Sequence, residues 1–424
     1  MEPLILKSIL NSQGFPEGFL TALRQAASEL KVKRIALVGG SVRDGLLINR
    51  SQQILPNRNK NDIDLVIEGS AKELVGILTK CLGEDTITCS RSYEAYDTVK
   101  LKFNGVEIDF ATSREESYCL PGENPSIKAS VLEKDLARRD FKVNAMAIEL
   151  LSQEFLDPFG GINDLKAGKL NFLHSKSVEE DPTRVIRAAR YSARLGFELT
   201  PEGIKQVKST ISNWPWEDLS TNKCITNQHL PALSTRLRME FELLFEKEPW
   251  KIAIKNLQDW GALSLLDNHL QKDKEWSRRL HWGLQLGLPL LTVLIAGTNK
   301  PLKVAKRLQL SQKQQKLLQE SHELKEILIE RSLENYHENS LVPSYWCKFL
   351  ESSGWQPESV ALAISMNAPM RHYLLRWLLR WRKQISPKSA KTLLMEGWEE
   401  GPRLGEELNR LRLNEIDKCE LKKQ

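Results

Sequence analysis

The first third of the chain alternates short apolar runs with amphipathic stretches, a pattern typical of strands and helices packed in layers. Arg34–Gly40 (RIALVGG) is an apolar run that ends in two glycines. We therefore expect a buried strand there, which turns into a helix at Ser41–Leu47. Ile63–Gly69 (IDLVIEG) predicts a second strand, and Ala71–Leu82 has the apolar spacing of an amphipathic helix.

A β-hairpin is expected farther along the chain. Thr98–Phe103 and Val106–Thr112 both alternate apolar and polar residues, as half-buried strands do. Asn104-Gly105 joins them, and this pair favours a two-residue turn because both residues tolerate positive φ. The two strands should therefore pair directly.

From about Leu151 onward, strand signals nearly vanish and helix-periodic segments follow one another. These segments are Val185–Leu195, Leu237–Phe245, Val304–Ile327, Tyr373–Lys383 and Gly405–Leu413. Polar and proline-containing breaks separate them at Asn213–Thr226, Gly297–Pro301, Ser340–Pro343 and Ser386–Ser389. We expect an α+β fold, with a mixed sheet and helices at the N-terminus followed by an all-helical remainder.

Length and composition narrow the class of protein. At 424 residues the chain is too long for one core, and its net charge of +6 fits a polyanionic partner without establishing one. The six cysteines include no C-x-x-C pair, which argues against a zinc site and indicates reduced thiols. The start lacks a signal-peptide apolar region, and the most apolar stretch, Leu284–Gly297, is too short to span a bilayer. We expect a cytoplasmic protein with no membrane partner.

Asp62 and Asp64 are the first candidates for chemistry. They lie two apart on a predicted strand, so their side chains point to the same face. Carboxylates at that spacing suit Mg²⁺, which binds them together with substrate phosphates. The alternative, a solvated turn, is the commoner meaning of an isolated Asp-x-Asp. Upstream, the Gly39-Gly40 turn lets phosphates approach a helix N-terminus and Arg43, which favours the metal site.

Asp109 is the candidate third carboxylate. Val106, Ile108 and Phe110 share the apolar face of their strand, so Asp109 points to the other face. A third acid beside a metal pair can align or deprotonate an attacking hydroxyl. The alternative is an ordinary exposed acid on a strand.

Arg138-Arg139 opens a further motif, RRDFKVNA, which also contains Asn144. Two adjacent arginines offer a planar, bidentate grip for a triphosphate. A basic helix start is an equally common meaning. The stretch Asp157–Leu165 (DPFGGINDL) is a rigid turn with glycines, and it serves either as a hinge or as a simple connector.

Glu180–Arg190 (EDPTRVIRAAR) is the most distinctive stretch. Arg184, Arg187 and Arg190 recur every three residues and lie along one stripe of a helix. Asp181 is an acceptor and Arg184 a donor one turn later, so together they can meet the Watson–Crick edge of a base. A solvated basic face is the usual meaning of such a stripe. The apolar residues between the arginines show that another side of the helix is packed.

In this order, the motifs closely resemble those of the class II tRNA nucleotidyltransferase family, which includes bacterial poly(A) polymerases. The resemblance covers roughly Arg34–Phe197 and continues more weakly through Ser234–Phe245 and Glu396–Leu411. It implies a nucleotidyltransferase-type palm in a catalytic head, residues 1–150. It also implies a helical neck with a base-selecting template (151–225), a helical body (226–340) and a helical tRNA-binding tail (341–424).

The resemblance also implies roles for single residues. Asp62 and Asp64 resemble the metal-binding pair, Asp109 the third acid, and Asp181 with Arg184 the pair that reads the incoming base. The other nucleotide-binding residues that it implies are Gly39, Gly40, Arg43, Arg139, Asn144, Glu180, Arg187 and Arg190, and among them Glu180 holds the template arginine in place.

The implied activity is the addition of all or part of the 3′-terminal CCA to tRNA, from CTP and ATP, with Mg²⁺ as cofactor and pyrophosphate released. The alternatives are a poly(A) polymerase of the same family, an enzyme that adds only CC or only A, and an inactive RNA-binding protein. The intact acids argue against the last. Glu115–Leu136, where the family keeps a flexible loop needed for the final A, is not deleted, which favours addition of A.

Two departures from the family pattern stand out. A polar insert, Asn49–Lys60, is longer than the usual link, and Lys142 replaces the usual threonine.

In the expected tail, Arg371–Lys391 holds seven Lys or Arg residues and no acid. Trp377 and Trp381 in this stretch predict a packed helix face rather than a base-stacking platform. The candidates for contact with RNA phosphates are Arg376, Arg380, Arg382 and Lys383.

Overall fold

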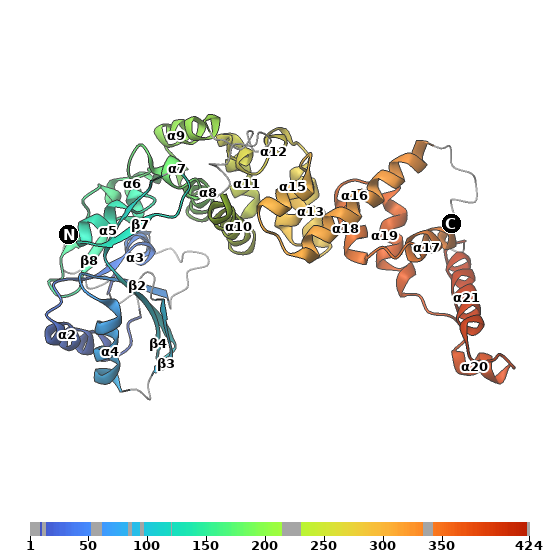
Figure 1. Ribbon diagram of the computed structural model, residues 1–424, viewed down its shortest axis with the longest axis horizontal. Coiled ribbons are helices and arrows are strands. Elements are labelled where there is room, and N and C mark those ends of the chain that lie inside the picture. Colours follow the sequence, from blue (N-terminus) through green and yellow to red (C-terminus); the bar gives the residue numbers. More distant parts are fainter. Residues whose placement is uncertain are drawn as a thin grey trace. The chain divides into compact units, whose positions relative to one another are not determined.

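A computed structural model of the chain describes residues 9–10, 14–51, 62–83, 87–93, 97–119, 121–213, 230–333 and 342–421. The chain divides into two compact units, Met1–Leu265 and Leu266–Gln424, which differ in architecture (Figure 1). The first unit contains a sheet and helices, and the second is helical throughout its described residues. Within the described ranges, we find no helix with the length and apolar character needed to cross a bilayer.

The first unit is built on a mixed seven-stranded sheet with the order β3-β4-β5-β2-β1-β8-β9. Its strands are β1 (Ile35–Val38), β2 (Asp62–Ile67), β3 (Ile87–Tyr93), β4 (Thr98–Phe103), β5 (Val106–Thr112), β8 (Ala147–Glu149) and β9 (Phe155–Leu156). Strands β2 and β5 are parallel, and the other neighbours are antiparallel. All four strands predicted from the sequence are present, and β4 and β5 have the predicted bounds.

One face of the sheet is covered by helices α2 (Phe19–Leu30) and α4 (Ala71–Leu82). The ring of Phe19 lies 6.2 Å from that of Phe103 and 6.4 Å from that of Phe110, measured between centroids. Helix α4 has the predicted bounds, and its first turn is capped by the Ser70 hydroxyl, which accepts from the Glu73 amide at 3.3 Å. Because strand side chains alternate, this packing leaves the polar residues of β2 and β5 on the opposite face.

Among the residues that the structure describes, the opposite face is covered only in part. Near β1 and β2 an apolar cluster joins the sheet to α5 (Leu132–Ala137), through Leu132 and Leu136 against Val38 and Val66. The other elements of this region are α3 (Gly40–Ser51), η3 (Lys142–Asn144) and a separate hairpin of β6 (Arg114–Ser117) and β7 (Ser126–Ala129). The segment Glu115–Leu136, which the resemblance equates with a flexible loop, thus contains a hairpin and a helix.

Helices complete the first unit. They are α6 (Gly161–Ala167), α7 (Ser177–Glu180), α8 (Thr183–Leu195), α9 (Pro201–Ser212), α10 (Leu230–Lys247), α11 (Trp250–Trp260) and η5 (Ala262–Leu265), with a small parallel pair of β10 (Lys169–Leu170) and β11 (Glu198–Leu199). Helix α8 packs against α10 and α11. The helices predicted at Val185–Leu195 and Leu237–Phe245 are therefore present in α8 and α10. The predicted break at Asn213–Thr226 lies outside the described residues after Asn213, as does the insert after Ser51.

The second unit consists of short helices and two longer ones. They are α12 (Asn268–Lys272), α13 (Trp276–Gln285), α14 (Leu290–Ile295), α15 (Pro301–Arg307), α16 (Gln312–Leu333), α17 (Pro343–Ser352), α18 (Pro357–Ser365), α19 (Arg371–Leu379), η7 (Trp381–Lys383), α20 (Ala390–Met395) and α21 (Pro402–Leu421).

Two helix predictions are wrong in their extent. Tyr373–Lys383 is not a single helix, because α19 ends at Leu379 and η7 begins at Trp381, after Arg380 with a non-helical φ of −125°. Val304–Ile327 is not a single helix, because α15 ends at Arg307 and α16 begins at Gln312. Gln309 between them has φ of 54°, a left-handed conformation that a continuous helix excludes. The Ser311 hydroxyl then accepts from the Gln314 amide at 3.3 Å and starts the second helix. The apolar spacing continues across the break, which is why periodicity alone missed it.

Candidate active site

The acidic residues predicted on β2 and β5 lie on the uncovered part of the sheet. Asp64 pairs in register with Asp109 across the two parallel strands, and Asp62 pairs with Glu107. Asp64 is exposed, and the side chain of Asp109 is 29% exposed. The side chain of Asp62 lies outside the described part of the structure, although its backbone belongs to β2. Neighbouring strands lie about 4.8 Å apart, so Asp64 and Asp109 are adjacent on one face.

A lysine on the neighbouring strand partly neutralises this row of carboxylates on β2 and β5. The Nζ of Lys100 on β4 lies 3.2 Å from Oδ2 of Asp109, and Lys100 pairs in register with that residue. Adjacent carboxylates repel each other unless a positive charge lies nearby. Carboxylate oxygens on an open sheet face fit a hard divalent cation. Among the side chains that the structure describes, no group of three or more His, Cys, Asp or Glu is arranged to hold one.

Next to Asp64 is a cavity of about 420 Å³, within the size range of small-molecule sites. Nine of the residues singled out in the sequence line it: Gly39, Gly40, Asp64, Arg138, Arg139, Asn144, Asp181, Arg184 and Arg187. They come from β2, the turn after β1, the motif after α5, the end of α7 and helix α8. The structure thus brings Asp64 of the sheet, Asp181 after α7 and Arg184 of α8 to the wall of one cavity.

The glycine turn after β1 adopts a backbone that needs glycine. Gly39 has φ of 69°, and a Cβ added there would lie 3.0 Å from Nη1 of Arg139. Gly40 begins the twelve-residue helix α3, so backbone N–H groups at a helix N-terminus border the cavity. This arrangement favours an anionic group, and Arg139 lies beside it.

Arg43 lies behind the cavity wall rather than on it. Its side chain is 2% exposed, and its Nη1 donates to the Asn144 side-chain oxygen at 2.6 Å while its Nε donates to Asp44 at 2.7 Å. Asn144 does line the cavity, and its own amide nitrogen donates to Asp140 at 2.9 Å. In this structure Arg43 therefore acts on the cavity through Asn144.

Two arginines flank a buried acid below the cavity. Nη2 of Arg139 lies 3.0 Å from Oδ2 of Asp135, and Nη2 of Arg138 lies 2.7 Å from the other oxygen. Burial would raise the pKa of Asp135, but the charges of Arg139 and Arg138 outweigh it and lower this pKa below its usual value. Asp135 therefore stays ionised and fixes the direction of both arginines.

Asp181 and Arg184 are held by different partners. Oδ1 of Asp181 accepts from the amide of Thr183 at 3.1 Å and from its hydroxyl at 2.7 Å. Arg184 is 5% exposed and donates to the carbonyl oxygens of Ser177 at 3.2 Å and Arg138 at 2.9 Å. Its Nη1 lies 3.6 Å from Glu180, which is 28% exposed and does not line the cavity. Both members of the pair are thus fixed in orientation before any ligand binds.

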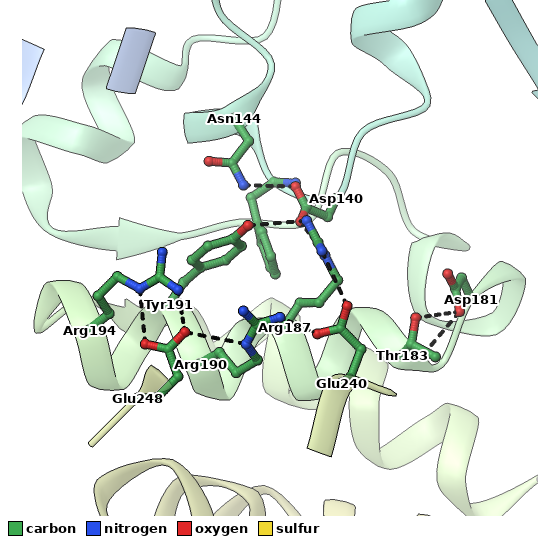
Figure 2. A network of polar contacts seen from close by, with 11 residues as sticks. Asp140, Asn144, Asp181, Thr183, Arg187, Arg190, Tyr191, Arg194, Glu240 and Glu248 are labelled. Atoms are coloured by element: carbon green, nitrogen blue, oxygen red, sulfur yellow. Dashed lines mark hydrogen bonds and ion pairs between the residues drawn. The ribbon is translucent and has the colours of Figure 1, made fainter. Parts of the chain in front are cut away.

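Figure 2 shows how the arginine stripe of α8 is neutralised by acids from other elements. Nη2 of Arg187 lies 2.7 Å from Asp140, and its Nη1 lies 3.3 Å from Glu240 on α10. Arg190 pairs with Glu240 and with Glu248, and it does not line the cavity. The structure thus gives Arg187 a place on the cavity wall and Arg190 a place in the packing of α8 against α10.

Asp140 is the central acid of this network. Burial would raise its pKa, but Arg187 and the hydrogen bonds from Asn144 and the Phe141 amide outweigh this effect and lower the pKa below its usual value. Burial likewise opposes the charge of Arg187, yet Tyr191, Asp140 and Glu240 raise the pKa of Arg187 well above its ordinary value. The pair therefore stays charged in the folded protein.

Several cavity residues were not predicted as site residues. They are Glu116, Tyr118, Asp140, Thr183, Tyr191, Arg236, Met239 and Glu240. The guanidinium carbon of Arg43 lies over the ring of Tyr191, 5.1 Å from its centroid. The guanidinium carbons of Arg187 and Arg194 lie 5.5 and 5.6 Å from the same centroid. One signal was available for it, since Tyr191 follows Arg187 by one helical turn.

Residues of the second unit predicted to contact RNA are on its surface. Arg376, Arg380, Arg382 and Lys383 are exposed, in or next to α19 and η7. Trp377 and Trp381 are each 3% exposed, so the prediction that they pack rather than stack on bases is confirmed. Nε1 of Trp377 donates to Glu351 at 3.1 Å.

Comparison with known proteins places these features in a family context. Residues 35–171 match the Poly A polymerase head domain. The chain is 30% identical over 256 residues to the A-adding tRNA nucleotidyltransferase of Aquifex aeolicus, covering 56% of this chain and 30% of that protein. It is 33% identical over 236 residues to the CC-adding tRNA nucleotidyltransferase of Deinococcus radiodurans, covering 55% of each. The matches thus span less than two thirds of either relative.

The fold extends the similarity over nearly the whole chain. The solved structure of the Thermotoga maritima CCA-adding enzyme complexed with tRNA superposes with a TM-score of 0.69 at 22% identity, covering 97% of this chain and 94% of that one. Together these matches confirm the resemblance to class II tRNA nucleotidyltransferases and poly(A) polymerases that the motifs indicate.

Proposed function

We propose that this chain, which carries a poly A polymerase head domain, adds all or part of the 3′-terminal CCA to tRNA from CTP and ATP and releases pyrophosphate. One observation carries the proposal: Asp64 on the sheet and Asp181 with Arg184 on the helical side line the same cavity. A single nucleoside triphosphate can then place its phosphates at the first site and its base at the second.

The phosphate side of the cavity supplies the chemistry. Asp62 and Asp64 would hold Mg²⁺, which stabilises charge on the attacking and leaving oxygens when it is bound. Asp109, adjacent to Asp64, aligns or deprotonates the 3′-hydroxyl of the RNA. The turn at Gly39 and Gly40 and the guanidinium of Arg139 hold the triphosphate. Asn144, oriented by Arg43, gives a further polar contact.

The base side of the cavity supplies selection. Cytosine and adenine each present an amino donor beside a ring-nitrogen acceptor, whereas guanine and uracil present a carbonyl beside an N–H donor. Asp181 accepts from the amino group, and Arg184 donates to the ring nitrogen. A wrong base leaves these groups unpaired, which is strongly unfavourable in a site shielded from water. Glu180 holds Arg184, and Arg187 is the remaining nucleotide-binding residue on the cavity wall. Arg190, predicted from the sequence to bind nucleotide, supports the site through its ion pairs with Glu240 and Glu248.

The rest of the chain would serve the RNA. We assign residues 1–150 to the head, 151–225 to the neck, 226–340 to the body and 341–424 to the tail. The exposed residues Arg376, Arg380, Arg382 and Lys383 contact phosphates of the duplex arms of tRNA, which proteins recognise mainly by shape and charge. A tRNA substrate supports the cytoplasmic location that we include in the proposal.

The length of the product tests the proposal. We offer the protein tRNA transcripts that end at the discriminator base, at C and at CC, with each nucleotide alone and with CTP and ATP together. Addition that stops at CCA supports the proposal in full, and addition restricted to CC or to A supports its partial forms. Long adenylate tails on messenger-like RNA, without defined addition to tRNA, would instead identify a poly(A) polymerase. No incorporation on any RNA would contradict both.

A further inference from the structure

The tip of the β6–β7 hairpin is fastened to the segment that contains Asp181. The amide of Gly122 donates to the carbonyl of Glu180 at 3.1 Å. Nη2 of Arg236 on α10 donates to the carbonyl of Gly122 at 2.8 Å. The same guanidinium also donates to the carbonyl of Glu123 at 3.4 Å and to the side chain of Asn124 at 3.4 Å. Three segments that are far apart in the sequence therefore meet at one side chain.

The same guanidinium also faces the base-selecting acid. Nη2 of Arg236 lies 3.8 Å from Oδ1 of Asp181, and both residues line the cavity. At that distance Arg236 contributes positive charge but no hydrogen bond. Asp181 thus keeps acceptor capacity for a ligand while Arg236 balances its negative charge.

We infer that Arg236 is a specificity-determining residue, which holds the hairpin tip Pro121–Asn124 against Asp181 and so fixes one wall of the base site. The inference rests on the proposed function and deepens it, since it names a residue that controls which base is accepted. A planar guanidinium suits this role because it presents several donors in a fixed fork to carbonyl oxygens from two directions. A lysine keeps the charge but cannot reproduce the fork.

The position of Arg236 on α10 explains why its side chain reaches the cavity. Arg236 and Glu240 are four residues apart and therefore share one face of the helix, which borders the cavity. Arg238 lies on a different face, where its Nε is 3.9 Å from Glu242. The side chains of Arg236 and Arg238 are equally exposed, at 26% each. Arg238 is therefore a matched control of the same type, helix and burial.

The test compares Arg236→Ala, Arg236→Lys and Arg238→Ala in the full chain. The first readout is base discrimination, the ratio of kcat/KM for ATP over GTP and for CTP over UTP on tRNA. Because Arg236→Ala removes the charged hydrogen bonds that hold this wall in place, discrimination should fall about 10-fold to 100-fold. It should fall less in Arg236→Lys and stay at the wild-type value in Arg238→Ala.

The second readout is hydrogen exchange at the backbone amides of residues 122–124, measured without nucleotide or RNA. We expect faster exchange in Arg236→Ala than in Arg238→Ala. Without the Arg236 guanidinium, the carbonyl of Gly122 loses its donor and the hairpin tip is held less firmly. Unchanged exchange would overturn the inference even if the wild-type protein proved inactive on tRNA. Faster exchange with unchanged discrimination would overturn the specificity role. An inactive wild-type protein would refute the proposed function and, with it, that role.

Discussion

Replacing Asp64 by Asn is expected to lower nucleotide incorporation by about a thousandfold or more, a loss of about 4 kcal/mol of transition-state stabilisation. The side chain is exposed on the open face of β2, beside Asp109 and at the edge of the cavity. An amide keeps its shape but removes the negative charge that a divalent cation requires. Because the side chain is exposed, the fold and the affinity for tRNA should remain unchanged.

Glu107→Gln is the matched control for this effect. Glu107 lies on the same face, and its side chain faces Lys100 at 3.9 Å and Lys102 at 3.8 Å. Removing an exposed charge of this kind changes energies by less than about 1 kcal/mol, so incorporation should remain close to normal. The measurement is single-turnover incorporation at saturating Mg²⁺, with thermal melting and tRNA binding recorded on the same samples. Near-normal incorporation by Asp64→Asn would show that the carboxylate row has no catalytic role.

Replacing Arg184 is expected to impair the choice of base more than the binding of triphosphate. Its guanidinium donates to the carbonyls of Ser177 and Arg138, which hold it in the cavity wall with 5% of its surface exposed. Arg184→Ala removes the donor to the base and leaves two buried carbonyls unsatisfied, so it should also destabilise the protein by about 1–3 kcal/mol. Arg184→Lys keeps the charge and should destabilise less, yet it loses the fixed direction of the donor.

Separate measurements distinguish an effect of Arg184 on base choice from an effect on triphosphate binding. The kcat/KM for all four nucleotides reports base choice, and the Kd of inorganic triphosphate reports the phosphate side alone. We expect discrimination of ATP from GTP to fall by about 10-fold to 100-fold in both variants, with the triphosphate Kd nearly constant. An equal loss for every nucleotide, with weakened triphosphate binding, would assign Arg184 to the phosphate site and refute its template role.

Local chemistry explains the parts of the fold that the sequence predicted well. The hairpin of β4 and β5 follows from Asn104-Gly105, where both residues have positive φ in the structure. Helix α4 follows from its apolar spacing and from the Ser70 cap. Such signals act over a few residues, so one sequence contains them in full. The carboxylate row also follows from alternation along β2 and β5, once the two strands are known to be neighbours.

The remaining parts depend on contacts between distant segments. The arginine stripe of α8 predicted one basic face, but Glu240 and Glu248, 50 and 58 residues later, make Arg190 a packing residue. Arg236 enters the cavity through the packing of α10 on α8, which no local pattern specifies. The i, i+4 spacing of Arg236 and Glu240 was a visible signal, yet it does not reveal which helix face meets the cavity.

The central claim is that one nucleotide spans the cavity from Asp64 to Arg184. A crystal structure of the protein with Mg²⁺ and a non-hydrolysable analogue of ATP, collected without RNA, addresses it directly. We expect the triphosphate beside the Gly39 turn and Asp64, with the adenine amino group and ring nitrogen within hydrogen-bond distance of Asp181 and Arg184. Phosphates bound at the turn with the base directed away from α8, in a well-ordered complex, would contradict the account.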